Sequence, residues 1–257
     1  MSLKVSSESK ALFEILEWAL KSDSSIHSYP GIISITNTID ALLTNFWLRI
    51  RSSDALVFKQ IILLKELEPA LLFFQNRKTP PKLMLDGGGN IGLSSRYMLA
   101  YFPGLFSLIV EPHEGNADMI RKNLPDNRYR LIQQAIWFEN GIVYPDIEKN
   151  KVNSEWGFSF HASDIQKIDK GIVARSIKDI LENSDIKNLD YLKLDIEGAE
   201  EVIFKKDLSL SEVLEKVCCI SVEAHSLEFE KDLITILKKS GFRVKKSGEL
   251  VFGFRDE

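Results

Sequence analysis

The stretch Lys82-Leu-Met-Leu-Asp86-Gly-Gly-Gly-Asn90-Ile-Gly92 decides the fold of this chain. An apolar run that ends in an acidic residue and several glycines is typical of a buried strand that leads through a tight turn into a helix. We therefore expect a strand over 82–86, a helix over 93–101 and a second strand over 106–110. Such a βαβ unit predicts a ligand site at the carboxyl edge of a parallel sheet.

Strands and helices continue to alternate after this unit, and a hairpin around Ser247-Gly248 closes the chain. This order indicates an α/β fold with a doubly wound, mostly parallel sheet, to which the hairpin adds an antiparallel strand. Further helices are expected over 116–123, over 177–181 after a Ser176 cap, and over 227–239. Further strands are expected over 129–137, 142–144, 189–194, 217–222, 242–244 and 250–254. We also expect a hairpin turn at Asn140-Gly141 and a half-buried strand that contains Trp156, Phe158 and Phe160.

The first eighty residues have a different pattern, with apolar residues at helical spacing. Thr79-Pro80-Pro81 resists helix formation and marks a boundary. The chain is therefore predicted to divide into a helical N-terminal region, residues 1–80, and a cofactor-binding domain, residues 81–257. Helices in the N-terminal region are expected over 8–21, over 39–48, and over 55–74 with an end or a kink near Pro69.

Composition and charge exclude several classes of protein. The formal net charge is -4 and no long basic run occurs, so no nucleic-acid partner is expected, because such binding relies on clustered Lys and Arg. The most apolar segment, 55–74, is interrupted by lysines and glutamates, so no membrane span is expected. Two adjacent cysteines, Cys218 and Cys219, do not form a disulfide framework, and the first ten residues have no apolar signal core. We expect a cytoplasmic protein.

The glycine-rich turn is the first candidate binding element. Gly87, Gly89 and Gly92 match the pattern G-x-G-x-x-G, in which small residues let the backbone approach a nucleotide-like ligand. Asp86 precedes the glycines, where its negative charge would repel a pyrophosphate and attract an ammonium group. S-adenosylmethionine has an α-amino group, a sulfonium and no phosphate, so it fits this turn better than NAD. The expected cofactor-binding residues here are Asp86, Gly87, Gly88, Gly89, Asn90 and Gly92.

Glu111 is the second candidate for cofactor binding. It follows the second expected strand, where an acidic side chain accepts hydrogen bonds from ribose hydroxyls in both cofactor classes. Structural alternatives remain for both acids: Asp86 as the cap of the following helix, and Glu111-Pro112 as a solvated turn.

Two further strand ends carry polar residues toward the same edge. Alternation along an extended chain puts Lys193, Asp195 and Glu197 on one face, and it likewise puts Glu223 and His225 on one face of the next strand. The alternatives are a helix cap for Asp195 and a plain surface histidine for His225. Glu200 and Glu201 are expected to be first-turn acids that favour the helix dipole.

These motifs, in this order, resemble the FkbM family of S-adenosylmethionine-dependent methyltransferases. The resemblance covers roughly residues 81 to 245 and is carried mainly by Lys193-Leu-Asp-Ile-Glu-Gly-Ala-Glu200. It implies a seven-stranded, class I methyltransferase-like sheet and O-methylation of a sugar, glycan or secondary metabolite. The sequence departs from the family pattern at Gly87, where valine or isoleucine is more usual, and at Gly89, where alanine is more usual.

Methylation of an alcohol requires that the hydroxyl lose its proton, so a general base is expected near the acceptor. His225 and Asp195 are the candidate bases, and Glu223 is expected to orient or assist. Asp195 is also expected to contact the cofactor. With an ordinary imidazole, activity should rise through about pH 6.5.

A divalent metal is an alternative to a side-chain base. Carboxylates suit Mg²⁺ and an added imidazole suits Mn²⁺, and such an ion would acidify the hydroxyl. No spacing in the sequence is diagnostic of a metal site, so we expect none. The candidate ligands would be Asp195, Glu197, Glu223 and His225.

Two other functions stay open from the sequence. A nicotinamide-dependent oxidoreductase would share the glycine turn and Glu111. A non-catalytic binding module would use the N-terminal region as an interaction surface, and the same helices are candidates for contact between subunits of a homo-oligomer.

Overall fold

A seven-stranded sheet forms the centre of the protein, in the order β13-β14-β12-β11-β4-β5-β6. The computed structural model describes residues 6–22, 24–39, 42–125, 127–145, 160–161 and 171–255. Within the sheet, β14 is antiparallel to both of its neighbours and the other pairings are parallel. The strands are β4 Leu83–Gly87, β5 Phe106–Val110, β6 Tyr129–Ile132, β11 Leu189–Leu194, β12 Val217–Glu223, β13 Arg243–Ser247 and β14 Leu250–Phe254. The predicted fold class is confirmed.

The order of the parallel strands reverses between β4 and β11. The chain proceeds from β4 through β5 to β6 on one side, and from β11 to β12 on the other. In doubly wound sheets, ligands bind outside the carboxyl ends of the strands at such a switch point. Asp86 of β4 pairs in register with Lys193 of β11 across this point.

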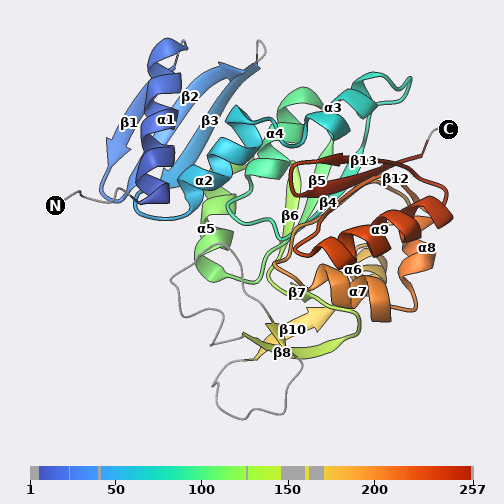
Figure 1. Cartoon of the computed structure of the whole chain (residues 1–257). Helices are drawn as coiled ribbons and strands as arrows, with labels where there is room; N and C mark the ends of the chain where they lie inside the picture. Colours follow the sequence, from blue (N-terminus) through green and yellow to red (C-terminus); the bar gives the residue numbers. More distant parts are fainter. Residues whose placement is uncertain are drawn as a thin grey trace.

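Helices cover both faces of the sheet, because successive residues of a buried strand point to opposite sides (Figure 1). Met84 packs in one apolar cluster with α4 and α5, and Leu85 packs in a second cluster with α6 to α9. Ser176 and Ser226 cap α6 and α9 through their hydroxyl oxygens, as such residues do at helix starts. These helices are α4 Leu93–Tyr101, α5 Glu114–Asn123, α6 Ile177–Glu182, α7 Glu200–Lys206, α8 Leu210–Leu214 and α9 Leu227–Lys239.

The N-terminal region is not mostly helical, contrary to expectation. The helix α1 Ser7–Lys21 is confirmed, but an antiparallel sheet follows, formed by β1 Ser25–Tyr29, β2 Ile32–Ile39 and β3 Leu42–Arg49. The helix expected over 39–48 is wrong because its apolar residues alternate along a strand: Phe46 and Leu48 are buried and pair with Ile35 and Ile33. Figure 1 shows α1 and these strands, in blue, at one end of the molecule.

The long core helix expected over 55–74 is also wrong. Three short helices replace it: α2 Asp54–Phe58, the π-helix η1 Lys59–Leu63, and α3 Glu68–Gln75. Pro69 does not end a helix but lies in the first turn of α3, where its missing N–H has no helical partner to lose. Phe58, Leu67 and Phe74 join the same apolar cluster as Met84. Packing is therefore continuous across residue 80, and the division into two domains stays a prediction.

A second, small sheet has the order β7-β10-β8-β9, with β7 Ala135–Ile136, β8 Gly141–Pro145, β9 Phe160–His161 and β10 Ile172–Arg175. The strand expected over 129–137 is thus divided between β6 and β7. Asn140-Gly141 does not form the expected hairpin between paired strands, since β10 lies between β7 and β8. The expected strand residues Trp156 and Phe158 lie outside the described residues. In the described part of the chain, no helix is long and apolar enough to cross a membrane.

Candidate functional site

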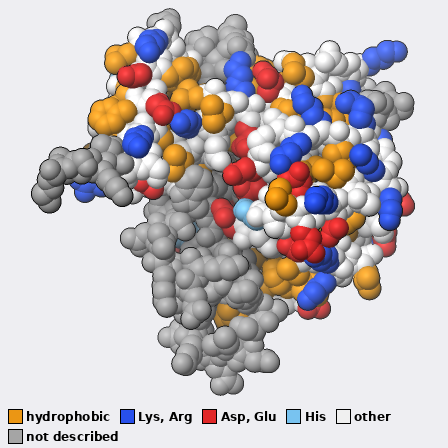
Figure 2. All heavy atoms as spheres, in the orientation of Figure 1, with side chains coloured by type: hydrophobic (Ala, Val, Ile, Leu, Met, Phe, Trp, Pro, Cys, Tyr) orange, Lys and Arg blue, Asp and Glu red, His pale blue; other side chains and the backbone are white. Residues whose placement is uncertain are grey.

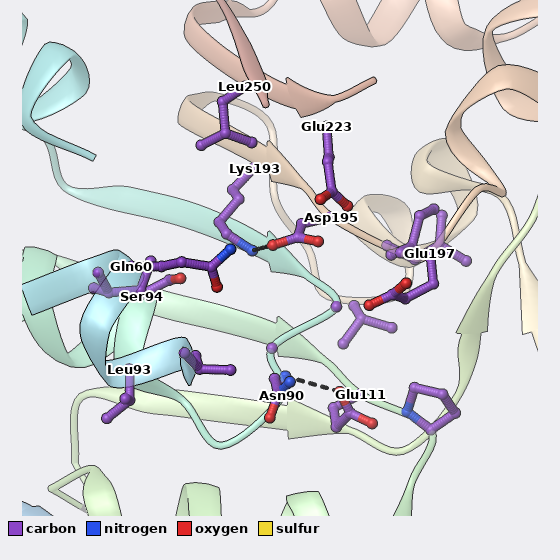
Figure 3. Close-up of a pocket in the computed structure, with 18 of the residues that line it drawn as sticks. Gln60, Asn90, Leu93, Ser94, Glu111, Lys193, Asp195, Glu197, Glu223 and Leu250 are labelled. Atoms are coloured by element: carbon purple, nitrogen blue, oxygen red, sulfur yellow. Dashed lines mark hydrogen bonds and ion pairs between the residues drawn. The ribbon is translucent and has the colours of Figure 1, made fainter. Parts of the chain in front are cut away.

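A cavity opens at the carboxyl edge of the sheet, over the switch point between β4 and β11 (Figure 3). Its walls come from the glycine turn after β4, the ends of β5, β11 and β12, the segment before β7, and the α2–η1 segment of the N-terminal region. The described lining residues are Val57, Gln60, Ile61, Glu66, Gly88, Gly89, Asn90, Leu93, Ser94, Val110, Glu111, Pro112, Gln134, Ala135, Ile136, Lys193, Asp195, Ile196, Glu197, Glu223 and Leu250.

Backbone forms the wall at the glycine turn. Gly88 has a φ of +74°, and a Cβ atom there would lie 1.7 Å from the carbonyl oxygen of Asp195. The N–H groups of Gly88 and Gly89 donate to the carbonyl of Val110, at 3.0 and 3.2 Å. Only glycine at position 88 allows this close approach of the turn to the end of β11. Gly87 and Gly92 belong to the same turn but are not among the described residues that line the cavity.

Glu111 faces the cavity while bound to the turn beside it. The N–H of Asn90 donates to its Oε2 and the N–H of His113 donates to its Oε1, both at 2.8 Å (Figure 3). The side chain is only 5% exposed, and burial raises its pKa to about 7. Asn116 adds a side-chain hydrogen bond to the same carboxyl group. A carboxylate has about four acceptor sites, so it can still accept from a ligand hydroxyl.

Asp86 lies beneath the cavity and is fully buried. Its carboxylate accepts a hydrogen bond from Ser95 Oγ at 2.7 Å and lies 3.3 Å from Lys193 Nζ. Lys193 Nζ also donates to Asp195 at 3.1 Å. Burial alone would lower the pKa of Lys193, but Asp195 and Asp86 outweigh it and raise the pKa. The ammonium that we expected Asp86 to attract is therefore supplied by the protein itself.

Asp195, Glu223 and His225 come together as expected. The side chain of Asp195 is about one third exposed. Burial acts to raise its pKa, but Lys193, Glu223 and His225 together outweigh burial and the pKa is lowered. Burial, and then Asp195, raise the pKa of Glu223 to about 8. Asp195 is thus the carboxylate most readily ionised at neutral pH.

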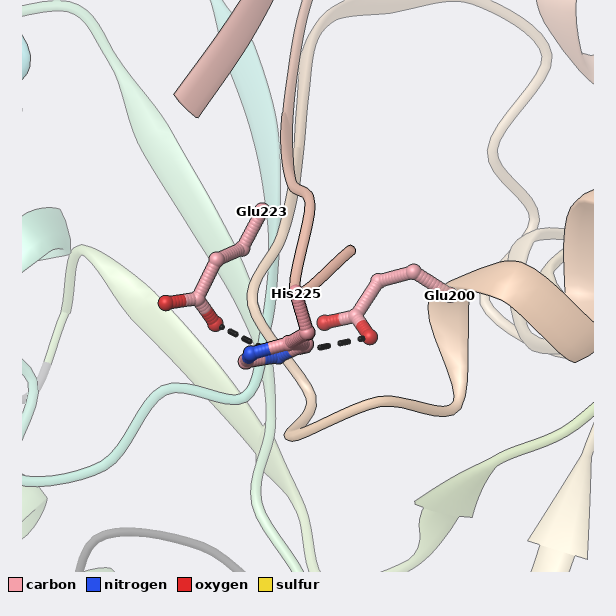
Figure 4. Close-up of side chains that lie close together, drawn as sticks. All are labelled: Glu200, Glu223 and His225. Carbon is pink, nitrogen blue, oxygen red and sulfur yellow. Dashed lines mark ion pairs between the residues drawn. The ribbon is translucent and has the colours of Figure 1, made fainter. Parts of the chain in front are cut away.

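His225 lies behind Glu223, with its Nε2 3.0 Å from Glu223 Oε2 and 3.9 Å from Glu200 Oε2 (Figure 4). It is not among the described residues that line the cavity. Contact with Glu223 raises its pKa to about 9, although partial burial opposes this. The pKa of His225 is thus raised above the ordinary value near 6.5 that we expected, and the imidazole favours its protonated form at neutral pH. The dependence of activity on pH stays a prediction.

Glu200 and Glu201 take the positions expected of them in the first turn of α7. Glu200 is buried and accepts from the N–H groups of Ile196 and Gly198, which anchors the turn that follows β11. Glu201 forms an ion pair with Lys205 at 2.6 Å.

Three of these side chains form a group of potential metal ligands. Glu200, Glu223 and His225 each offer one atom, and these atoms lie within 4.8 Å of one another (Figure 4). This set shares only Glu223 and His225 with the ligands considered from sequence. Both Glu200 oxygens already accept from backbone N–H groups, and Glu223 Oε2 forms an ion pair with His225 Nε2, so each of these groups has a partner in the protein. That no metal is needed stays a prediction.

Two polar residues that line the cavity come from the N-terminal region, and the sequence analysis did not select them. Gln60 lies in the π-helix η1, and Glu66 lies in the turn after it. Glu66 is half-buried, and burial, followed by the charge of Asp195, raises its pKa to about 7. Neither residue belongs to a motif, and in the sequence Glu66 only interrupts an apolar run.

The fold and the site together define a class of protein. A doubly wound sheet with a glycine turn, an acidic residue after the second strand and a cavity at the switch point is characteristic of enzymes that bind a nucleoside-derived cofactor. The model of the family described as Methyltransferase FkbM domain matches residues 86–244, more than half of the chain. The chain therefore belongs to the FkbM methyltransferase family, and its cofactor is S-adenosylmethionine.

Solved structures of other methyltransferases are similar at low identity. A precorrin-6y methyltransferase from Geobacter metallireducens GS-15 is 13% identical, with 73% of this chain and 87% of that chain covered and a TM-score of 0.43. The N-terminal domain of human METTL16, in complex with SAH, is 13% identical, with 74% and 66% covered and a TM-score of 0.43. No curated protein matches the chain.

Proposed function

We propose that this methyltransferase transfers the methyl group of S-adenosylmethionine to a hydroxyl oxygen of a sugar, glycan or secondary metabolite. The observation that carries the proposal is the placement of Asp195, a carboxylate with a lowered pKa, on the cavity wall beside the backbone of the glycine turn. A hydroxyl acceptor needs a proton acceptor at the reacting end, and this carboxylate supplies one.

The cofactor half of the cavity fits S-adenosylmethionine. Gly88, Gly89 and Asn90 bring backbone close to the cavity, and Glu111 keeps acceptor capacity for a ribose hydroxyl beside its contacts with Asn90, His113 and Asn116. The bound cofactor supplies a methyl carbon made electrophilic by its sulfonium. Asp86 acts indirectly, because it forms an ion pair with Lys193, and Lys193 forms an ion pair with Asp195 at the cavity.

At the acceptor half, Asp195 is the candidate general base. Lys193, with contributions from Glu223 and His225, lowers its pKa against the effect of burial and keeps it ionised at neutral pH, whereas Glu223 and His225 both have raised pKa values. We therefore assign His225 a positioning role, in which it holds Glu223 beside Asp195. Methyltransferases that act on amino groups often have Asn or Asp followed by Pro-Pro and an aromatic residue at the end of this strand. The present chain has Asp195-Ile-Glu-Gly198 there, which favours oxygen over nitrogen as the acceptor atom.

Two measurements test the function. Calorimetric titration with S-adenosylhomocysteine and with NAD separates a methyltransferase from an oxidoreductase, and tight binding of NAD alone would refute the proposal. A mass-spectrometric screen of hydroxyl acceptors then separates an enzyme from a binding module. Asp195→Asn is expected to lower turnover by about 10²- to 10⁴-fold with folding retained. An N-methylated product with an intact hydroxyl would overturn the assignment of oxygen.

Assembly through the N-terminal region and cytoplasmic location also stay predictions. The face of α1 exposes Phe13 and Leu20, which supports contact between subunits. Light scattering on the wild type and on a Phe13→Ser, Leu20→Ser double variant tests it: a monomer in both samples would contradict the prediction.

A further inference from the structure

Two polar side chains of the cavity come from outside the family match. Gln60 and Glu66 precede the matched residues 86–244, yet both line the cavity beside Asp195 and Lys193. The methyltransferase domain alone therefore does not complete the cavity wall. The residues that the N-terminal region adds to the cavity can therefore differ between proteins that share the same cofactor site.

The segment that carries them is held in place. The N–H of Glu66 donates to the carbonyl of Gln60 at 3.1 Å, which ties the two residues together across the end of η1. Buried Ile61 and Ile62 anchor the π-helix in the core, and Lys59 forms an ion pair with Glu14 of α1 at 2.6 Å. Single-turn π-helices are rare and occur frequently at functional sites.

Both side chains are directed at the end of the cavity where Asp195 lies. In Figure 3 the amide of Gln60 points toward Lys193 and Asp195. Glu66 reaches the turn between β13 and β14, where its Oε1 lies 3.4 Å from the position of a Cβ on Gly248. Glu66 and Asp195 line the same cavity, and the charge of Asp195 contributes, after burial, to the raised pKa of Glu66.

That space is strongly acidic. Among the described lining residues, the carboxyl groups are Glu66, Glu111, Asp195, Glu197 and Glu223, and the one ammonium is that of Lys193, which Asp86 and Asp195 already engage. Figure 2 shows Asp and Glu side chains gathered in the middle of the face, beside a histidine. The ionised Asp195 repels an anionic ligand at short range. The other four carboxyl groups have raised pKa values, and their oxygens accept hydrogen bonds from hydroxyl and ammonium groups.

We propose that Gln60 and Glu66 form the acceptor-binding wall of the cavity and select a polyhydroxylated acceptor, neutral or amine-bearing, that has no phosphate or carboxylate near the reacting hydroxyl. The inference rests on the proposed methyl transfer to oxygen. Gln60 supplies one amide donor and acceptor pair, and Glu66 accepts from a hydroxyl or ammonium of the acceptor. The glycine turn and Glu111 contact the cofactor, and the proposed role of Gln60 and Glu66 does not alter these contacts.

The charge class is tested with the full-length protein and S-adenosylmethionine labelled with tritium in its methyl group. A polar small-molecule extract of the source cells is separated by ion exchange into anionic, neutral and cationic pools, and each pool is offered as acceptor. Label is expected in the neutral or cationic pool. Label in the anionic pool alone overturns this inference but leaves methyl transfer intact. No label in any pool, with S-adenosylhomocysteine bound, refutes the proposed function itself.

The residue roles are tested in the labelled pool. Glu66→Gln and Gln60→Ala are expected to raise the acceptor KM about 5- to 10-fold, with kcat and S-adenosylhomocysteine affinity within about twofold of wild type. The exposed Glu68→Gln and Gln75→Ala are matched controls and should leave KM unchanged. Gln60→Met removes the amide but keeps the length of the side chain, so it tests the role of the amide even if Gln60→Ala does not fold. Weakened S-adenosylhomocysteine binding with unchanged acceptor KM would place the two residues on the cofactor side and overturn the inference.

Discussion

The ammonium of Lys193 lies 3.3 Å from the carboxylate of Asp86, with the two side chains 2% and 0% exposed. Adjacent parallel strands bring the pair together at the switch point of the sheet. A buried charge is costly to leave unpaired, so each partner depends on the other. The pair also supports Asp195, which accepts from the same ammonium at the cavity surface.

Removal of Lys193 should destabilise the fold. Lys193→Met leaves Asp86 buried with Ser95 as its remaining side-chain donor, and a loss of about 3 to 5 kcal/mol in the free energy of unfolding is expected. Urea denaturation followed by circular dichroism measures it. Lys205→Met, at an exposed ion pair, is the control and should leave the urea midpoint unchanged. Equal midpoints for both variants would show that the buried pair contributes nothing.

Glu111 should contribute to cofactor affinity. Glu111→Ala removes a charged hydrogen-bond acceptor from the cavity wall, and a loss of about 10- to 100-fold in S-adenosylhomocysteine affinity is expected. Isothermal titration calorimetry checks this, with the exposed Glu114→Ala as control. Unchanged affinity in Glu111→Ala, with the fold intact by circular dichroism, would remove Glu111 from the cofactor site.

Gly88 should tolerate no side chain. Gly88→Ala would place a Cβ 1.7 Å from the Asp195 carbonyl oxygen and would strain a φ of +74°, so both thermal stability and S-adenosylhomocysteine binding are expected to fall. Gly104→Ala meets no atom within 4 Å and serves as the control. If Gly88→Ala melts and binds as wild type does, the close approach of the two backbones is incorrect.

The raised pKa of His225 predicts how stability depends on pH. Its pKa is about 9 in the folded protein and about 6.5 when unfolded, so the folded state binds the proton more tightly. The resulting stability is fully present below about pH 6.5 and is lost as the pH rises through about 9. The melting temperature should therefore fall from pH 7 to pH 10, and His225→Gln should flatten this fall. An unaltered pH profile in the variant would contradict the raised pKa.

The same shift predicts the kinetics of His225→Gln. A protonated imidazole at neutral pH is not the base, so kcat at pH 7 should fall by less than about tenfold, below the range for loss of a general base. Wild-type kcat should show no limb near pH 6.5, because Asp195 is already ionised there. A wild-type limb near 6.5 that disappears in the variant would restore His225 as the base.

Metal dependence is tested by dialysis against a chelator. We expect turnover to survive, since both Glu200 oxygens accept from backbone N–H groups and Glu223 forms an ion pair with His225. Activity that is lost on chelation and restored by Mg²⁺ or Mn²⁺ would assign these three side chains as metal ligands.

Much of the catalytic domain could be predicted from the sequence because its signals are local. The helices over 93–101 and 227–239 and the strands over 106–110 and 189–194 agree with the structure residue for residue. Short apolar runs bounded by glycine, serine caps and charged residues restrict these segments to one structure. The carboxyl edge of the sheet then brings Glu111, Asp195 and Glu223 to one cavity, as the alternation pattern predicts.

The N-terminal region could not be predicted in the same way. The apolar residues of 39–48 fit a helix and a strand almost equally, and only the pairing of β3 with β2 decides between them. Gln60 and Glu66 carry no motif, and they reach the cavity only because η1 packs beside the sheet.

The sequence by itself determined the doubly wound fold, the glycine turn and the acidic residues at the strand ends, because hydrophobic period and turn chemistry act over a few neighbouring residues. Tertiary structure decided which charges meet. Strand order pairs Asp86 with Lys193 and leaves Asp195 as the ionised carboxylate at the surface. Contact with Glu223 raises the pKa of His225. Charge interactions and burial depend on distances between segments far apart in the chain, and no local pattern records those distances.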